Sequence, residues 1–343
     1  MRAMMLDRPG GTLQLTTLPP PEPAEGEVLV SVHACGICRT DLHIVDGDIQ
    51  DGSYPVIPGH QIVGHVMAHG PRQTSDGKSS HAQTPLPPVG SRVGIPWLGH
   101  TCGHCDFCRS GTENLCDSAE FTGYQRHGGF AELVCADARF CLPLPDTYPD
   151  LQAAPLLCAG LIGYRALRMT GDAQRIGFYG FGNAAHILTQ IAAWQGRQVY
   201  AFTRPGDKQG QAFARSLGAC WAGSTDQQPD QLLDAGIIFA PAGELLPLAL
   251  AQLRKGGRLI CAGIHMSEIP AFPYHLLWGE RSIASVANLT RDDGLALLEL
   301  APQVPVRTQV QVYELPELVQ ALDDLRAGRI TGGGVIRIGS GHQ

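Results

Sequence analysis

The stretch RIGFYGFGNAAHILTQIAAW, residues 175–194, decides the fold of this chain. It begins as an apolar strand, turns at Gly180-x-Gly182-x-x-Ala185 and continues as a helix. The two glycines allow a tight turn and a close approach of the backbone to a pyrophosphate, and the small Ala185 lets helix and strand pack together. The N-terminus of the helix then offers free N–H groups to the anion. In this strand–turn–helix context the motif predicts a dinucleotide-binding fold.

Apolar strands alternate with helical stretches around this turn. Helices are expected over residues 183–196, 208–219 and 244–257, with strands over 198–203, 233–241, 258–263 and 281–289. Such alternation is typical of a parallel sheet with crossover helices. A doubly wound sheet usually ends after its sixth strand, so we expect this domain to span residues 156–288.

The first half of the chain has a different pattern. Short β-branched runs at residues 27–36, 61–70, 91–98 and 130–145 predict strands joined by turns. The last fifty residues are expected to hold one helix, over 315–329, and one strand, over 334–339. We therefore predict a mostly β domain made of residues 1–155 and 289–343. The polar stretch between Gly70 and Val89 has no period and is expected to be an exposed, mobile loop.

Composition narrows the function. A chain of 343 residues is long enough for two domains. Its net charge of −7 argues against a nucleic-acid or anionic-membrane surface. The N-terminus has no apolar leader, and no run of about 18 apolar residues occurs, so we expect a cytoplasmic protein. Eleven cysteines without a secretion signal then indicate metal binding or catalysis rather than disulfides.

The strongest local signal is CGHCDFCRSGTENLC, residues 102–116. Cys102, Cys105, Cys108 and Cys116 follow one another with two, two and seven intervening residues. Four thiolates so close in sequence fit a tetrahedral structural zinc ion. An iron–sulfur cluster uses similar spacing and is the alternative, but no proline follows the last cysteine.

A second, dispersed set comprises Cys38, His60 and Cys158. Two thiolates and one imidazole would leave a fourth zinc position open, as catalytic zinc requires. Spacing alone makes this a weak signal, because lone cysteines are usually small buried apolar residues. Core packing is accordingly the role expected for the remaining cysteines: Cys35, Cys135, Cys141, Cys220 and Cys261.

The strand after the glycine turn ends at Thr203 and Arg204. A carboxylate at this point would accept hydrogen bonds from the adenosine ribose of NAD, whereas a guanidinium can pair with the 2′-phosphate of NADP. The sequence therefore favours NADP. The alternative is that Arg204 points to solvent or stacks on adenine.

With these features in place, the chain resembles the zinc-dependent alcohol dehydrogenases of the medium-chain dehydrogenase/reductase family. The similarity covers essentially the whole length and is strongest to the bacterial branch that resembles cinnamyl-alcohol dehydrogenases. The motifs occur in the expected order: ACGICRTDLHIVDGD (34–48), IPGH (57–60), GIPWLGHTCGHCDFCRSGTENLC (94–116), GGFAE (128–132) and PLLCAGLIGYRAL (155–167). The resemblance implies a GroES-like, mostly β catalytic domain with a structural-zinc lobe at about residues 97–118, and a Rossmann cofactor domain.

The resemblance also implies roles for individual residues. Cys38, His60 and Cys158 would hold a catalytic zinc ion, and the four-cysteine run a structural one, giving two zinc ions per chain. The remaining implied roles are a carboxylate orienting the ligand histidine (Asp41), a hydroxyl binding the substrate oxygen (Thr40), the outer end of a proton relay (His43), a cofactor pyrophosphate contact (Arg39) and the wall of the alcohol pocket (Trp97).

The implied reaction is reversible hydride transfer between a primary alcohol or aldehyde and NADP or NAD, with NADP favoured. Relatives of this kind are homodimers or homotetramers. A non-catalytic NADP-binding relative and a zinc-free quinone or enoyl reductase of the same fold are the alternatives. Two positions depart from the family: Gln61 replaces the usual glutamate after the ligand histidine, and glycines of RITGGGVIRI (329–338) fall where many members carry a cofactor-binding arginine.

Overall fold

The computed structural model describes residues 1–49, 51–71 and 86–339. The chain forms two compact units. Unit 1 comprises Met1–Cys158, Asn288–Pro302 and Thr308–Gln343, and unit 2 comprises Ala159–Ala287 and Gln303–Arg307. Most of the loop expected between Gly70 and Val89 lies outside the described residues.

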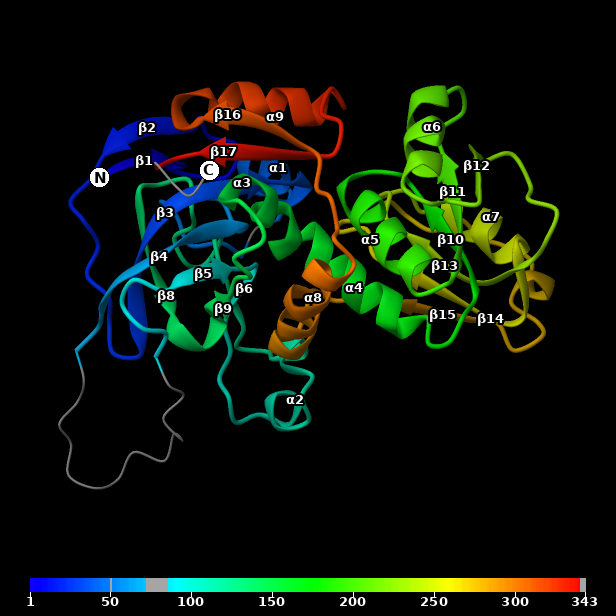
Figure 1. The fold of residues 1–343 in the computed structure, drawn as a ribbon, viewed down its shortest axis with the longest axis horizontal. Helices are drawn as coiled ribbons and strands as arrows, with labels where there is room; N and C mark the ends of the chain where they lie inside the picture. The colour runs from blue at the N-terminus through cyan, green and yellow to red at the C-terminus, as the bar shows by residue number, and fades with distance from the viewer. Residues whose placement is uncertain (50, 72–85, 340–343) are drawn as a thin grey trace. The chain divides into compact units, whose positions relative to one another are not determined.

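Unit 1 is built on a seven-stranded sheet in the order β16-β17-β3-β4-β5-β9, with β8 also paired to β3. Apart from the parallel pair β16–β17, its strands pair antiparallel. Figure 1 shows the C-terminal strands in the same sheet as β3, with α9 beside them. Its strands are β3 (Glu27–Ile37), β4 (Ile62–His69), β5 (Arg92–Ile95), β8 (Leu133–Asp137), β9 (Leu142–Pro143), β16 (Val310–Glu314) and β17 (Gly333–Arg337).

Two small sheets and several short helices complete unit 1. One sheet pairs β1 (Arg2–Met5) with β2 (Gln14–Thr17), and the other pairs β6 (Leu98–His100) with β7 (Glu120–Phe121). The α-helices are α1 (Arg39–Asp46), α2 (Asp106–Arg109), α3 (Asp150–Ala153), α8 (Arg291–Gln303) and α9 (Leu318–Arg326). The 3₁₀ turns are η1 (Glu113–Leu115), η2 (Ala138–Phe140), η3 (Ala154–Leu157) and η5 (Leu315–Glu317).

Strand β3 is central to this unit. Its side chains alternate between buried and partly buried along Glu27–Val32, which is the period of two expected of a strand packed on a core. It pairs with β4, β8 and β17, and its apolar side chains belong to one continuous core that includes Val28, Val30 and Ile336.

Unit 2 is a six-stranded parallel sheet in the order β12-β11-β10-β13-β14-β15. Its strands are β10 (Arg175–Tyr179), β11 (Gln198–Thr203), β12 (Trp221–Ser224), β13 (Leu233–Ile238), β14 (Leu253–Cys261) and β15 (Ser282–Ser285). Its helices are α4 (Ala159–Met169), α5 (Asn183–Trp194), α6 (Lys208–Ser216) and α7 (Leu245–Ala251), with a 3₁₀ turn η4 (Tyr274–Leu276). The strand order reverses beside β10, as in a Rossmann sheet. The predicted fold class, a mostly β domain with a Rossmann domain, is confirmed.

Several expectations of detail were wrong. Helix α8 and strands β12 and β16 were not predicted. The helix expected over 244–257 ends at Ala251, because Gly256 has a φ of 73° and Leu253 begins β14 opposite Leu233. Cys220 is exposed rather than buried, since it lies beside the outermost strand β12 and its thiol donates to the carbonyl of Val199.

No helix among the described residues is long and apolar enough to cross a membrane.

Candidate active site and metal centres

Cys38, His60 and Cys158 lie together in unit 1. Because β3 and β4 run antiparallel, the residue after the end of β3 and a residue just before β4 meet at the same edge of the sheet. Cys38 Sγ lies 3.1 Å from His60 Nε2 and 4.0 Å from Cys158 Sγ, and the three donor atoms all lie within 4.8 Å of one another. Donors around tetrahedral zinc are about 3.5–3.8 Å apart, so small side-chain shifts would bring these three atoms around the ion and leave one position open.

The start of α1 orients this donor set. Asp41 and His60 are completely buried, and Asp41 Oδ1 lies 3.2 Å from His60 Nδ1. The other carboxylate oxygen accepts a hydrogen bond of 2.8 Å from the backbone N–H of Cys38. A carboxylate on Nδ1 fixes the ring so that Nε2 faces the sulfur, as in metal-binding histidines generally. Burial raises the pKa of Asp41.

The thiols of Cys38 and Cys158 have pKa values that are shifted in opposite directions. The Sγ–H of Cys158 donates to Cys38, which lowers the pKa of Cys38 well below its usual range, and the same contact raises the pKa of Cys158. The thiolate is the form of cysteine that binds a metal. Cys38 is therefore the donor that is most readily deprotonated.

Thr40 and His43 follow Cys38 on α1. Thr40 is only 5% exposed and its backbone N–H donates to Cys38 Sγ at 3.3 Å. Nδ1 of His43 lies 2.7 Å from a carboxylate oxygen of Asp48, which returns to the helix after Gly47 turns the chain with a φ of 82°. Asp48 was not among the residues predicted from the sequence. The signal was available as a histidine followed five residues later by an aspartate, with a glycine between them.

Trp97 lies beside His60. Their rings make an edge contact, with centroids 4.9 Å apart and an angle of 74°. Phe121 stacks on Trp97 at 5.0 Å, and Tyr124 stacks on it at 6.0 Å. These two aromatic side chains were missed, because nothing in the spacing of the sequence relates them to Trp97.

Gln61 is completely buried, and neither end of its side-chain amide has a hydrogen-bond partner among the described residues. Its side chain lies over Gly36, where an added Cβ would be 2.5 Å from Oε1. Gly36 and Cys38 are two residues apart on extended backbone, so they present the same face. The amide therefore lies on the side of β3 to which Cys38 belongs.

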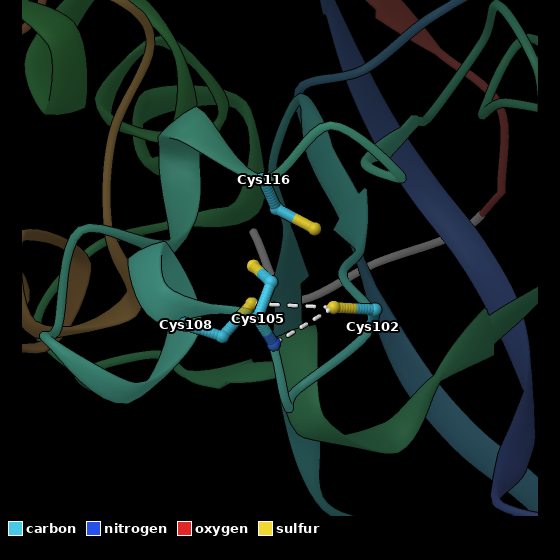
Figure 2. A group of neighbouring side chains, drawn as sticks. All are labelled: Cys102, Cys105, Cys108 and Cys116. Atoms are coloured by element: carbon cyan, nitrogen blue, oxygen red, sulfur yellow. Dashed lines mark hydrogen bonds between the residues drawn. The ribbon is translucent and has the colours of Figure 1, made fainter.

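The four cysteines of the 102–116 loop also converge. Figure 2 shows their sulfurs turned toward one another, and all four lie within 4.8 Å. Cys102 Sγ is 3.9 Å from Cys108 Sγ, close to the separation that tetrahedral zinc requires. Backbone N–H groups of His104 and Cys105 lower the pKa of Cys102 to about 6, which favours the metal-binding thiolate.

The glycine turn of unit 2 has the geometry expected of a pyrophosphate site. Gly180 has a φ of 93°, and an added Cβ would lie 2.9 Å from that of Ala240. Gly182 caps the N-terminus of α5, and a Cβ there would meet no protein atom within 4 Å. Ala185 is completely buried. The turn therefore leaves room for a ligand at the start of a twelve-residue helix.

The residues expected to bind the rest of the cofactor differ in exposure. Thr203 is buried at the end of β11, where its hydroxyl accepts from the Gln211 amide. Arg204 is exposed and forms no ion pair or hydrogen bond through its side chain among the described residues. Arg39, the first residue of α1 in unit 1, is exposed as well.

Comparison with known proteins identifies the family. Residues 24–146 match the alcohol dehydrogenase GroES-like domain. The probable alcohol dehydrogenase AdhA of Mycobacterium tuberculosis (strain CDC 1551 / Oshkosh) is 43% identical over 345 residues, covering 98% of this chain and 97% of that protein. The chain belongs to the alcohol dehydrogenases of the medium-chain dehydrogenase/reductase family.

Solved structures with a similar fold align over nearly the whole chain. A cinnamyl alcohol dehydrogenase of Sorghum bicolor has a TM-score of 0.84 and 25% identity, covering 98% of this chain and 97% of the other. The acetophenone reductase of Geotrichum candidum, solved in complex with NAD, has a TM-score of 0.84 and 25% identity over 98% of this chain and 96% of the other.

Proposed function

We propose that this alcohol dehydrogenase is a zinc-dependent enzyme that interconverts primary alcohols and aldehydes with a nicotinamide cofactor. The observation that carries the proposal is the convergence of Cys38, His60 and Cys158, whose donor atoms lie within 4.8 Å. Two sulfurs and one nitrogen leave room for a substrate oxygen, whereas the four-cysteine loop offers a closed set of donors. We assign one catalytic and one structural zinc ion to each chain.

Zinc held by the three donors would supply Lewis-acid polarisation of the substrate oxygen. Side chains of the protein would then accept and transfer the proton of the substrate hydroxyl. Thr40 would hydrogen-bond the substrate oxygen, and His43 would accept the proton at the outer end of the relay. Asp41 keeps His60 oriented through Nδ1. Trp97 would line the substrate pocket.

NADP is the cofactor that we propose in preference to NAD, with the nicotinamide supplying or accepting the hydride. The turn at Gly180, Gly182 and Ala185 would hold the pyrophosphate. Arg204 supports the preference, because its exposed guanidinium follows β11 without a carboxylate partner. Thr203 lies beside it, and Arg39 would add a phosphate contact. An Arg204→Asp variant that keeps the wild-type ratio of NADP to NAD efficiency would contradict this assignment.

We further propose that unit 1 is the catalytic domain, with residues 97–118 as its structural-zinc lobe, and that unit 2 is the cofactor domain. A homodimer or homotetramer in the cytoplasm is the expected form of the enzyme. Eleven cysteines, among which no disulfide is formed, suit a reducing compartment. Light scattering coupled to size-exclusion chromatography measures the assembly.

One experiment tests the function as a whole. Zinc content is measured per chain, and NADPH oxidation by a panel of aliphatic and aromatic aldehydes is followed with and without a chelator. We expect two zinc ions and activity that the chelator abolishes. Activity untouched by chelation would indicate a zinc-free reductase, and cofactor binding without turnover would indicate a non-catalytic relative. Either result overturns the proposal.

A further inference from the structure

Cys158 reaches the candidate metal site by a different route from the other two donors. Cys38 and His60 flank the paired strands β3 and β4, so the sheet itself sets their separation. Cys158 follows the segment of α3 and η3, which no strand pairing fixes. Some other interaction must therefore hold that segment against the sheet.

A buried ionic cluster anchors the start of this segment. Asp150, the first residue of α3, accepts a hydrogen bond of 2.7 Å from Arg92 Nε and lies 3.0 Å from His33 Nδ1. The Arg92 and Asp150 side chains are only 8% and 4% exposed. The two terminal nitrogens of Arg92 donate to the carbonyls of Pro145 and Tyr148, at 2.9 and 2.6 Å. One guanidinium thus fixes three points between residues 145 and 150.

Two members of this cluster, Arg92 and His33, belong to the same sheet that positions Cys38 and His60. Arg92 begins β5 and lies opposite His65 of β4. His33 lies at an irregularity in the pairing of β3 with β4, between Val32 and Ala34. Such bulges redirect a side chain, and here the ring faces Asp150 and contacts the ring of His65 at 4.7 Å.

The path from Asp150 to Cys158 is short and tightly packed. Ala153, Ala154, Leu156 and Leu157 are all completely buried. Leu157, which precedes Cys158, packs on Gly94 of β5, where an added Cβ would lie 2.5 Å from Leu157 Cδ2. Strand β5 therefore holds both ends of the segment, through Arg92 at its start and Gly94 at its end.

We propose that Arg92, with Asp150 and His33, is a positioning residue that places Cys158 within reach of the metal bound by Cys38 and His60. The inference rests on the proposed function, since it assigns a partner to the three-donor metal site. Arginine is required for it, because its three nitrogens donate separately to the carboxylate and to the two carbonyls, which the single nitrogen of a lysine cannot reach at the same time.

The test compares the two metal sites within one protein. In Arg92→Lys, zinc affinity at the three-donor site is measured by competition with a chelator, and Co²⁺ absorption distinguishes two sulfurs with a nitrogen from four sulfurs. We expect the three-donor site to weaken by about 10–100-fold, the range found when groups that orient metal ligands are lost. Affinity at Cys102, Cys105, Cys108 and Cys116 should stay unchanged. The readout does not depend on turnover.

Arg175→Lys is the matched control, because Arg175 forms a comparable pair with Asp234 in unit 2, where the described residues contain no candidate metal group. It should leave both affinities as they are. If Arg92→Lys does not fold, His33→Ala decides alone, since it removes one contact to Asp150 and keeps the arginine; a weaker three-donor site is again expected. Wild-type affinity in a folded variant overturns the inference, whereas a wild-type chain that binds no zinc at the three-donor site overturns the proposed function.

Discussion

A carboxylate oxygen of Asp48 lies 2.7 Å from Nδ1 of His43, across the turn that ends α1. The backbone N–H of Asp48 also donates to the carbonyl of His43 at 2.9 Å. The histidine is therefore held by a residue five positions later in the chain. A carboxylate on Nδ1 selects the tautomer whose Nε2 accepts a proton, which is the atom a proton relay needs.

Asp48→Asn should slow alcohol oxidation by about 10-fold, because an amide does not select this tautomer and part of the general-base contribution is lost. The solvent deuterium isotope effect on turnover should rise, since proton transfer becomes the slower step. Asp46→Asn is the control, because Asp46 lies on the same helix but pairs with Arg326 at the surface. Wild-type turnover and isotope effect in Asp48→Asn would show that Asp48 does not support the relay.

Gln61→Glu should move the acidic limb of the pH profile for alcohol oxidation upward by about one pH unit. An added negative charge beside the proposed zinc site would stabilise the protonated form of a bound alcohol, so a higher pH would be needed to remove the proton. Gln14→Glu adds the same charge on the exposed strand β2 and should leave the limb in place. If the acidic limb of the pH profile does not move in Gln61→Glu, Gln61 has no electrostatic role and only packs against its neighbours.

The burial of His186 should make the folded protein less stable in acid. Burial lowers the pKa of this completely buried side chain of α5 to about 4. Its pKa in the unfolded chain is about 6.5, so the unfolded state binds the proton first as the pH falls from about 6.5 to 4. Up to ~3 kcal/mol of the free energy of unfolding should be lost over this window. Urea unfolding of wild type and His186→Leu at several pH values checks this. In His186→Leu the free energy of unfolding should fall less steeply with pH between about 6.5 and 4 than in wild type. The same pH dependence in both proteins would contradict this prediction.

Tyr179→Phe should stabilise the protein by about 1–2 kcal/mol. The Tyr179 side chain is 1% exposed, and its hydroxyl has no hydrogen-bond partner among the described residues. Removing an unsatisfied buried polar group relieves its desolvation cost while the ring keeps its stack on Phe202. Tyr148→Phe is the contrasting control, because it removes a hydrogen bond of 2.8 Å to the carbonyl of Ala301 and should destabilise. Thermal unfolding measures both; destabilisation by Tyr179→Phe would be the contrary result.

The sequence predicted the features whose signal is local. The glycine turn, the alternation of strands and helices, and the close spacing of four cysteines all lie within short windows. Helix α8 was not predicted, because Gly294 and Pro302 interrupt its helical pattern of apolar residues. The structure gives Gly294 a packing role instead, since an added Cβ would lie 2.7 Å from Leu142 Cδ1. A glycine that admits a neighbour cannot be distinguished in one sequence from a glycine that ends a helix.

Long-range partnerships could not be predicted from residue spacing. Cys38, His60 and Cys158 were a weak set until the family resemblance related them. The contacts of Trp97 with Phe121 and of Arg92 with Asp150 join residues far apart in the chain. The first contact depends on the register of paired strands, which needs the turn geometry as well as the hydrophobic period. The second depends on the packing of α3, a helix that no strand pairing fixes.

The last donor of each cysteine-containing set is translated at a different stage of synthesis, Cys116 for one set and Cys158 for the other. The loop from Cys102 to Cys116 brings its four sulfurs together within a short window, so it can capture an ion soon after it leaves the ribosome. The set of Cys38, His60 and Cys158 needs a third donor that is translated about a hundred residues after His60. If both sets bind zinc as proposed, the nascent chain should load the two ions in sequence, with the proposed catalytic site filled last.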